Sequence, residues 1–173
     1  EKSGECTLAE LCYEYGIKES SFEGEKKDYP VELTNPFIIR DMNKCILCGK
    51  CVRACNEVTG QDVLDFAYRG FNAKPIPFYD EELVQSNCVF CGQCVAVCPV
   101  GALTEKQMMG KGRRWELERT RTTCPFCGTG CNFDLCTKDG KLIGVASNPD
   151  SPVNNFGLCI KGRFGWDFVN NEN

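Results

Sequence analysis

The chain has 173 residues, of which 15 are cysteine and none is histidine, and its formal charge is −4. No apolar run approaches the roughly 20 residues that span a bilayer, and the acidic balance excludes a basic nucleic-acid footprint. The lack of histidine excludes a Ser-His triad, a haem-ligating histidine and a Cys/His zinc finger within these residues. No initiator methionine is present, so we expect a fragment or a processed product.

Near the start of the chain, residues 7–15 have the periodicity of a helix. Thr7 and Glu10 form the signature of a capping box, and Gly16 follows as a stop signal. One face of this helix is apolar and is expected to lie in the core: Leu8, Leu11, Cys12 and Tyr15.

Two cysteine runs with the same spacing lie 43 residues apart in the middle of the chain. Each run has the pattern C-x2-C-x2-C-x3-C, and Pro99 follows the second run. The runs agree at six of eleven aligned positions, including Gly49 and Gly92, so they form an internal repeat. This is the spacing of bacterial ferredoxins, in which the fourth cysteine of each run binds the other cluster.

The crossover of the fourth cysteine predicts two ligand sets. We assign Cys45, Cys48, Cys51 and Cys98 to the first 4Fe–4S cluster, and Cys88, Cys91, Cys94 and Cys55 to the second. Zinc fits less well, because two C-x2-C pairs suffice for zinc and the third cysteine of each run is left over. Disulfides also fit poorly, because nothing indicates a secreted protein and cysteines three residues apart in one loop are badly placed to pair.

A third group of cysteines, near the end of the chain, has a different spacing. Cys124, Cys127, Cys131 and Cys159 follow the pattern C-x2-C-x3-C-x27-C. We predict a β-hairpin in residues 132–145, because apolar residues alternate on both sides of Asp139-Gly140, a type I′ turn signal. A four-cysteine zinc site also fits this spacing, but the two neighbouring redox motifs favour a third 4Fe–4S cluster.

Three cysteines lie outside these sets. Cys136 is expected to pack in the hairpin as a small apolar residue, and Cys12 belongs to the apolar face of the predicted helix. Cys6 directly precedes that helix, and the spacing of the other cysteines assigns it no role.

The combination of motifs resembles the amino-terminal region of the catalytic (α) subunit of NAD-linked, molybdenum- or tungsten-dependent formate dehydrogenases. The resemblance rests on residues 36–106 and on residues 122–169, which include CPFCGTGC and NNFGLCIKGRFGWDFVN. The first part is similar also to the electron-relay regions of iron-only hydrogenases and of the large iron–sulfur subunit of NADH dehydrogenase. The second part is similar to the cluster domain that opens the molybdopterin oxidoreductase fold.

The resemblance implies roles for individual residues. The cysteine set 124, 127, 131 and 159 would hold the cluster nearest the molybdopterin, and Lys161 would lie between that cluster and the pterin. A cation in this place would offset the charge of a reduced cluster; an ordinary solvated lysine is the alternative. Cys6 would be the last ligand of a further cluster whose other ligands precede Glu1.

The resemblance also implies that the chemistry on formate takes place outside this chain. In the family it needs a cysteine or selenocysteine on the metal, together with a histidine and an arginine, in the domain that would follow residue 173. We therefore expect these residues to carry electrons through three 4Fe–4S clusters without catalytic residues of their own. The complete subunit would hold molybdenum or tungsten on molybdopterin bis-guanine dinucleotide.

We expect an α+β fold, with a two-cluster bacterial-ferredoxin-like domain followed by a small β-rich 4Fe–4S domain of the molybdopterin oxidoreductase type. Asp80 to Val84 are expected to open a short helix. The expected segments are a helix and linker left from an upstream iron–sulfur domain (1–35), the ferredoxin-like domain (36–106), a basic connector (107–121) and the third-cluster domain (122–173).

The expected function is the relay of single electrons between a molybdopterin site that interconverts formate and CO2 and a flavin/NAD-binding or iron–sulfur subunit of a cytoplasmic complex. Hydrogenase subunits or a ferredoxin are further expected partners, whereas nucleic acid and a membrane span are not expected. The alternatives are a stand-alone ferredoxin-like carrier, and the relay segment of a hydrogenase or NADH dehydrogenase iron–sulfur subunit.

Overall fold

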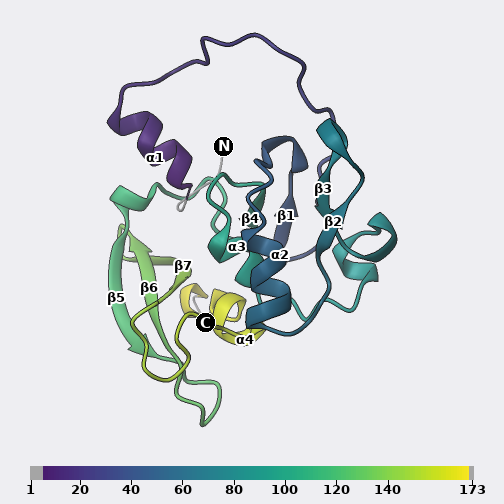
Figure 1. The fold of residues 1–173 in the computed structure, drawn as a ribbon. Coiled ribbons are helices and arrows are strands. Elements are labelled where there is room, and N and C mark those ends of the chain that lie inside the picture. The colour runs from purple at the N-terminus through teal and green to yellow at the C-terminus, as the bar shows by residue number, and fades with distance from the viewer. Residues whose placement is uncertain (1–5, 172–173) are drawn as a thin grey trace.

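The computed structural model of the chain describes residues 6–171 (Figure 1). The helices are α1 (Thr7–Glu14), α2 (Lys50–Arg53), α3 (Gln93–Val97) and α4 (Ile160–Phe164). The strands are β1 (Ile38–Arg40), β2 (Asp65–Ala67), β3 (Lys74–Ile76), β4 (Leu103–Glu105), β5 (Glu118–Thr123), β6 (Asn132–Lys138) and β7 (Lys141–Ser147). Among residues 6–171, no helix has both the length and the apolar character that crossing a bilayer requires.

The two cysteine runs are held together by a short antiparallel sheet of β1 and β4. Ile38 lies opposite Glu105 and Arg40 lies opposite Leu103. Because β1 precedes the first run and β4 follows the second, this pairing brings the start of one run close to the end of the other. The buried core beneath them contains Ile38, Val52, Val95 and Leu103.

Each run turns into a short helix at its glycine. Gly49 precedes α2 with φ of 73°, and Gly92 precedes α3 with φ of 71°. This left-handed conformation is one that glycine adopts readily and that a side chain disfavours. The repeated glycine therefore has a local structural reason at both positions.

Cys55 lies in a π-helical turn, Ala54–Val58, that directly continues α2. The Thr59 hydroxyl donates to the carbonyl oxygens of Ala54 and Cys55, at 3.2 and 2.8 Å, and closes the widened turn. Single π turns in helices are frequent at functional sites.

The segment between the two runs forms a β-hairpin and short 3₁₀ turns. β2 and β3 pair antiparallel, with Phe66 opposite Pro75. The prediction that a helix begins in the segment from Asp80 to Val84 is wrong in the start and the type of the helix, since the structure has a 3₁₀ turn at Leu83–Gln85. Asp80 has φ of +57°, which does not permit a right-handed helix to begin there.

The last third of the chain forms a three-stranded antiparallel sheet in the order β5-β6-β7. The predicted hairpin is confirmed as β6 and β7, and the turn residues Asp139 and Gly140 have φ of 52° and 74°, as a type I′ turn requires. β5 begins at Glu118, so the sheet extends into the segment expected to be a connector. Cys136 is fully buried against Met108, Ile143 and Ala146, which confirms its expected packing.

The helix predicted over residues 7–15 forms as α1, but two details of the prediction are wrong. The residue that caps it is Cys6, whose Sγ accepts a hydrogen bond from the Ala9 amide at 3.4 Å, and not Thr7. Leu8 and Leu11 are about half exposed, and α1 contains no buried residue. The helix is held at its first turn, where the Leu8 amide donates to the Pro99 carbonyl at 3.1 Å, so its expected apolar face is not covered.

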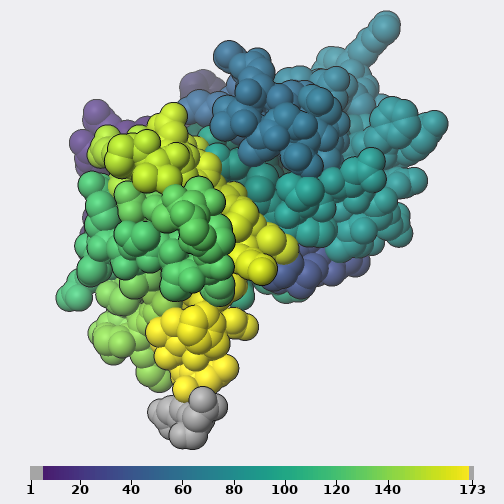
Figure 2. Space-filling model, turned by 90° about the horizontal axis from the view of Figure 1, so that it is seen from below, coloured from purple at the N-terminus to yellow at the C-terminus, as the bar shows by residue number. Residues whose placement is uncertain are grey.

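α4 lies between the sheet and the ferredoxin-like part. The C-terminal chain, yellow in Figure 2, runs along the boundary between the green and teal regions of the surface. Phe164 is buried in the core that contains the two cysteine runs, and its ring stacks on Phe37 with centroids 4.9 Å apart. The last helix therefore joins the two cysteine-bearing parts of the chain.

Candidate metal centres

The first predicted ligand set surrounds one small cavity. Cys45, Cys48, Cys51 and Cys98 all line it, together with Gly49 and apolar residues that include Met42, Val100 and Leu103. Cys98 comes from the second run and joins three cysteines of the first, as the crossover pattern predicts.

The second predicted set surrounds a neighbouring cavity in the same way. Cys88, Cys91, Cys94 and Cys55 line it, with Ile38, Val63, Leu64 and Leu83 among its apolar walls. Cys55, in the π turn that follows the first run, therefore lies beside the second run. Apolar walls around both cavities exclude water, which is one of the means by which a protein tunes a metal group.

The pKa values of the most buried thiols are raised by the other cysteines of the same sets. Burial, together with the adjacent thiols Cys45, Cys98 and Cys48, raises the pKa of Cys51 to about 12. Burial raises the pKa of Cys94 well above its ordinary value, and nearby Cys91, Cys88 and Cys55 act in the same direction. Cys51 also contributes to the raised pKa of Cys94, so the two sets are close neighbours.

The third set is brought together at the edge of the sheet. The amide of Cys124 donates to the carbonyl of Cys131 at 2.7 Å and closes the CPFCGTGC loop. Burial raises the pKa of Cys131, and Cys124, Cys127 and Cys159 each add to the effect. Cys159 stands at the start of α4 and is exposed, as is Cys127.

Backbone amides point at equivalent thiols in the two runs. The Leu47 amide donates to Cys45 Sγ and the Phe90 amide donates to Cys88 Sγ, each at 3.4 Å. Leu47 and Phe90 have φ of 57° and 51°, a conformation that costs energy for residues with a side chain. Amide donors of this kind stabilise the negative charge of an iron–sulfur cluster.

The donor chemistry of all three sets fits an iron–sulfur cluster. All 15 cysteines fall in residues 6–171 and are free thiols, and thiolates are the ligands that such clusters use. Within the same residues, no group of three or more Cys, Asp or Glu could hold a single metal ion. A zinc site needs four sulfurs about 2.3 Å from one ion, whereas the thiols of the first two sets are arranged around the walls of two cavities. The assignment of individual cysteines to clusters stays a prediction.

Comparison with protein families covers both cysteine-bearing parts of the chain. Residues 35–104 match the family described as "NADH-quinone oxidoreductase subunit 3, ferredoxin-like domain". Residues 117–171 match the "Molybdopterin oxidoreductase Fe4S4 domain". These two segments, which hold the three predicted cysteine sets, are thus similar to iron–sulfur domains of oxidoreductases.

Curated relatives of these iron–sulfur domains are much longer proteins. A subunit of an NADH-quinone oxidoreductase of Rhizobium meliloti is 38% identical over 171 residues, which cover 98% of this chain and 20% of the relative. The α subunit of the NADPH-Fe(3+) oxidoreductase of Geobacter sulfurreducens is 37% identical over 167 residues, 96% of this chain and 19% of that protein. The chain thus spans about a fifth of the length of these relatives.

A solved structure resembles part of the same iron–sulfur domains. A chain in the crystal structure of an NAD+-reducing [NiFe]-hydrogenase in the H2-reduced state matches with a TM-score of 0.50 and 28% sequence identity. The match covers 62% of this chain and 46% of that chain. Together with the two families, it agrees with the expected mixture of short helices and small sheets.

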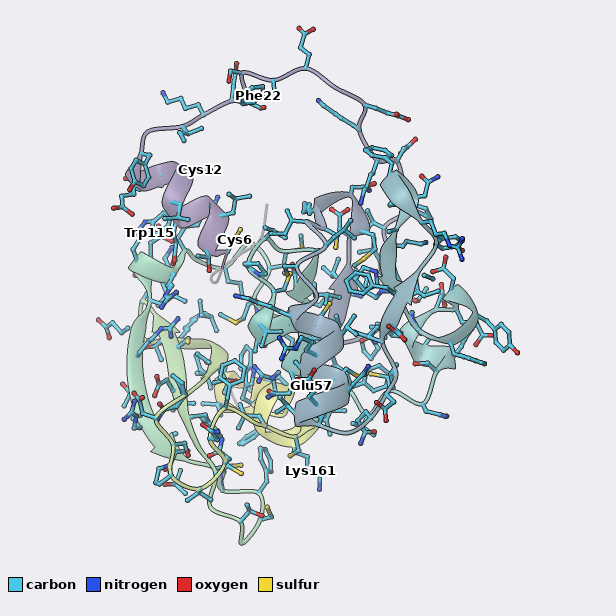
Figure 3. All side chains as sticks on the ribbon, in the orientation of Figure 1. Cys6, Cys12, Phe22, Glu57, Trp115 and Lys161 are labelled. Atoms are coloured by element: carbon cyan, nitrogen blue, oxygen red, sulfur yellow. The ribbon has the colours of Figure 1, made fainter. Side chains whose placement is uncertain are left out.

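Lys161, the residue expected beside a pterin, is exposed on α4. Its side chain projects away from the rest of the molecule in Figure 3. The pKa of Cys127 is lowered, chiefly by a side-chain hydrogen bond with Thr129 and in smaller part by the charge of Lys161. Lys161 therefore lies beside the third cysteine set and faces outward, and its role toward a pterin stays a prediction.

Cys6, the residue expected to complete a further cluster, is buried beside the first set. Its thiol donates to the carbonyl of Pro99 at 3.7 Å, and Pro99 directly follows Cys98. Residues 1–5 lie outside the described part of the chain, and the cluster role of Cys6 stays a prediction.

Sequence reasoning missed one residue of this region, Arg163. In the sequence it forms part of the run Lys161-Gly162-Arg163, which looks like a solvated surface. In the structure its side chain is buried against the loop that carries Cys91. The only signal in the sequence is a difference between the repeats, where Gln93 stands in place of Lys50.

Proposed function

We propose that this chain is an electron relay that holds three 4Fe–4S clusters within a larger oxidoreductase subunit. The ligand sets are those of the sequence: Cys45, Cys48, Cys51 and Cys98; Cys88, Cys91, Cys94 and Cys55; and Cys124, Cys127, Cys131 and Cys159. The observation that carries the proposal is that two of the sets line separate cavities, each combining three cysteines of one run with one of the other.

The clusters, when bound, would accept and donate single electrons. The protein would hold them, shield them from water and tune their potentials electrostatically. The thiols bind iron as thiolates, so their protons leave when a cluster is built. The amides of Leu47 and Phe90 donate toward thiols that would bind the first and second clusters. The apolar walls around both sets keep water away, which strengthens these interactions.

The arrangement supports a linear order of the three sites. Cys51 of the first set is a near neighbour of Cys94 of the second. Cys159 of the third set directly precedes α4, and Arg163 and Phe164 of α4 contact Cys91 and Gly92 in the loop of the second run. Electrons would therefore pass through the second site between the first and the third. The proposed domains remain 36–106 for the paired clusters and 122–173 for the third.

Within this class, the finer proposal is the catalytic subunit of a cytoplasmic, NAD-linked formate dehydrogenase. The resemblance of residues 36–106 and 122–169 supports it, and so does the family matched by residues 117–171. Formate and CO2 would be interconverted at a molybdopterin with molybdenum or tungsten, outside these residues. Flavin/NAD-binding and iron–sulfur subunits would exchange electrons with the relay, and Lys161 would face the pterin.

A second candidate is an iron–sulfur subunit of an NADH- or NADPH-linked complex with no formate chemistry. The two relatives compared above favour it, since their names refer to NADH-quinone and NADPH-Fe(3+) oxidoreductases. Metal analysis of the complete protein separates the candidates. About one molybdenum or tungsten atom per complete subunit supports the formate dehydrogenase, whereas its absence supports the second candidate.

The relay itself is tested by a redox titration monitored by electron paramagnetic resonance. We expect three one-electron reductions per chain, with spin–spin broadening as neighbouring clusters become reduced together, because the sites adjoin one another. A chain that takes up no electrons and has no visible absorbance would contradict the relay and support a structural zinc protein.

A further inference from the structure

Arg163 is the largest fully buried side chain among the described residues, with 2% of its surface exposed. It leaves α4 and reaches into the ferredoxin-like part. Its Nε donates to the Cys91 carbonyl at 3.0 Å, and one terminal nitrogen donates to Gln93 Oε1 at 3.0 Å and to Ser147 Oγ at 2.6 Å. Burying a charged group costs free energy unless hydrogen bonds or opposite charges compensate for the lost water. The burial of the Arg163 guanidinium therefore needs a structural or functional explanation.

The loop of the second cysteine run is shaped to receive this side chain. A Cβ added at Gly92 would lie 2.1 Å from Cδ and 2.6 Å from Nε of Arg163. The equivalent Gly49 of the first run has only the ring of Phe66 nearby, at an ordinary 3.6 Å. Gly92 is therefore needed for the close approach of Arg163, in addition to its left-handed backbone.

The residue that follows the glycine also differs between the two runs, and again only the second run suits Arg163. Gln93 is 1% exposed and accepts from Arg163, whereas Lys50, at the equivalent place in the first run, is exposed. The two runs are near copies of each other, but only the second is built to bind a guanidinium. A surface arginine would need neither the glutamine nor the open space at the glycine.

Arg163 also connects ligands of two different cluster sites. Its backbone amide donates to the Cys159 carbonyl at 3.0 Å, and its side chain donates to the Cys91 carbonyl. One residue and two hydrogen bonds thus join the proposed third set to the proposed second set. A guanidinium keeps its charge at any physiological pH, so a positive charge stays fixed beside the second site.

We propose, on the basis of the relay function above, that Arg163 is a positioning residue for electron transfer between the second and third clusters. It holds the Cys91 loop against α4, and its charge stabilises the reduced form of the second cluster. In each transfer one electron leaves one cluster, which is oxidised, and enters the other, which is reduced, with no proton or other reactant required. The extra negative charge on the reduced second cluster is what the guanidinium offsets.

The test is a redox titration of the complete protein with Arg163→Met and Arg163→Lys. Methionine keeps an apolar stem but removes the charge and the donors. At a fixed potential we expect the ratio of reduced to oxidised second cluster to fall at least tenfold, which is 59 mV for one electron. Lysine keeps the charge, so we expect the ratio to stay within threefold of the native protein.

Arg53→Met is the matched control. Arg53 lies two residues before Cys55 of the second set, but its side chain is 74% exposed, so water screens the charge. We expect this variant to leave the titration of the second cluster unchanged.

Three outcomes would overturn the proposal: Arg163→Met with full iron content and an unchanged second-cluster potential, Arg163→Lys as strongly shifted as Arg163→Met, or a shift as large in Arg53→Met. If Arg163→Met does not retain its iron, Arg163→Gln replaces it, because glutamine is neutral but still donates hydrogen bonds. An unchanged potential in that variant would equally overturn the proposal. A native protein without clusters would instead refute the relay function, so the two failures are distinguishable.

Discussion

Replacing Cys159 with alanine should remove one cluster of three and leave the other two reducible. Cys159 belongs to the third set, and its side chain is exposed, so the substitution deletes a ligand with little loss of packing. Iron should fall from about twelve to about eight atoms per chain, because each cluster contains four. Iron analysis and electron paramagnetic resonance of the reduced protein measure the two parts of this result.

Cys12→Ala is the control for Cys159→Ala. Cys12 is a half-buried cysteine of α1 that lies outside all three sets, so its removal should leave the iron content unchanged. Full iron and an unaltered spectrum in Cys159→Ala would show that the third ligand set is wrong. Loss of all the iron would show that the third site does not form independently of the paired clusters.

Removal of all the iron should unfold the chain. α2 and α3 have four and five residues, far below the ~12–15 at which isolated helices become even marginal. The strands that close the repeat, β1 and β4, have three residues each. When folding and metal binding are coupled in this way, the binding free energy of the metal group is folding free energy.

Circular dichroism during heating measures the effect of iron removal. The cluster-loaded protein should show a cooperative transition, and the protein stripped of iron under reducing conditions should show none. Rebuilding the clusters with iron and sulfide should restore the transition. An iron-free chain that unfolds cooperatively near the same temperature would contradict the account, because the side chains alone would then support the fold.

The parts of the fold that the sequence predicted are those with strict local requirements. Asp139-Gly140 needs positive φ at two successive residues, so the hairpin of β6 and β7 could be placed from the turn alone. The cysteine spacing likewise constrains how the chain turns, and the structure places Cys98 with the first run and Cys55 with the second, while their roles as cluster ligands stay a prediction. The matched families agree with the two kinds of iron–sulfur domain expected.

The parts that the sequence did not predict depend on tertiary contacts. The periodicity of α1 indicates an apolar face, but the contacts of α1, which include the Leu8 amide on Pro99 and the Tyr13 ring on Trp115, leave Leu8 and Leu11 half exposed. β5 begins with Glu118 and Arg119, with no apolar alternation to mark a strand. Arg163 resembles a surface arginine because nothing local distinguishes it, and its burial depends on Gly92 and Gln93, some 70 residues earlier.

The most direct test of the three-cluster relay is the iron and acid-labile sulfide content of the purified chain, measured together with zinc. A relay with three 4Fe–4S clusters contains about twelve iron and about twelve sulfide per chain, and we expect no stoichiometric zinc. About three zinc ions per chain with no sulfide would contradict the relay, and so would cysteines that prove to be paired in disulfides.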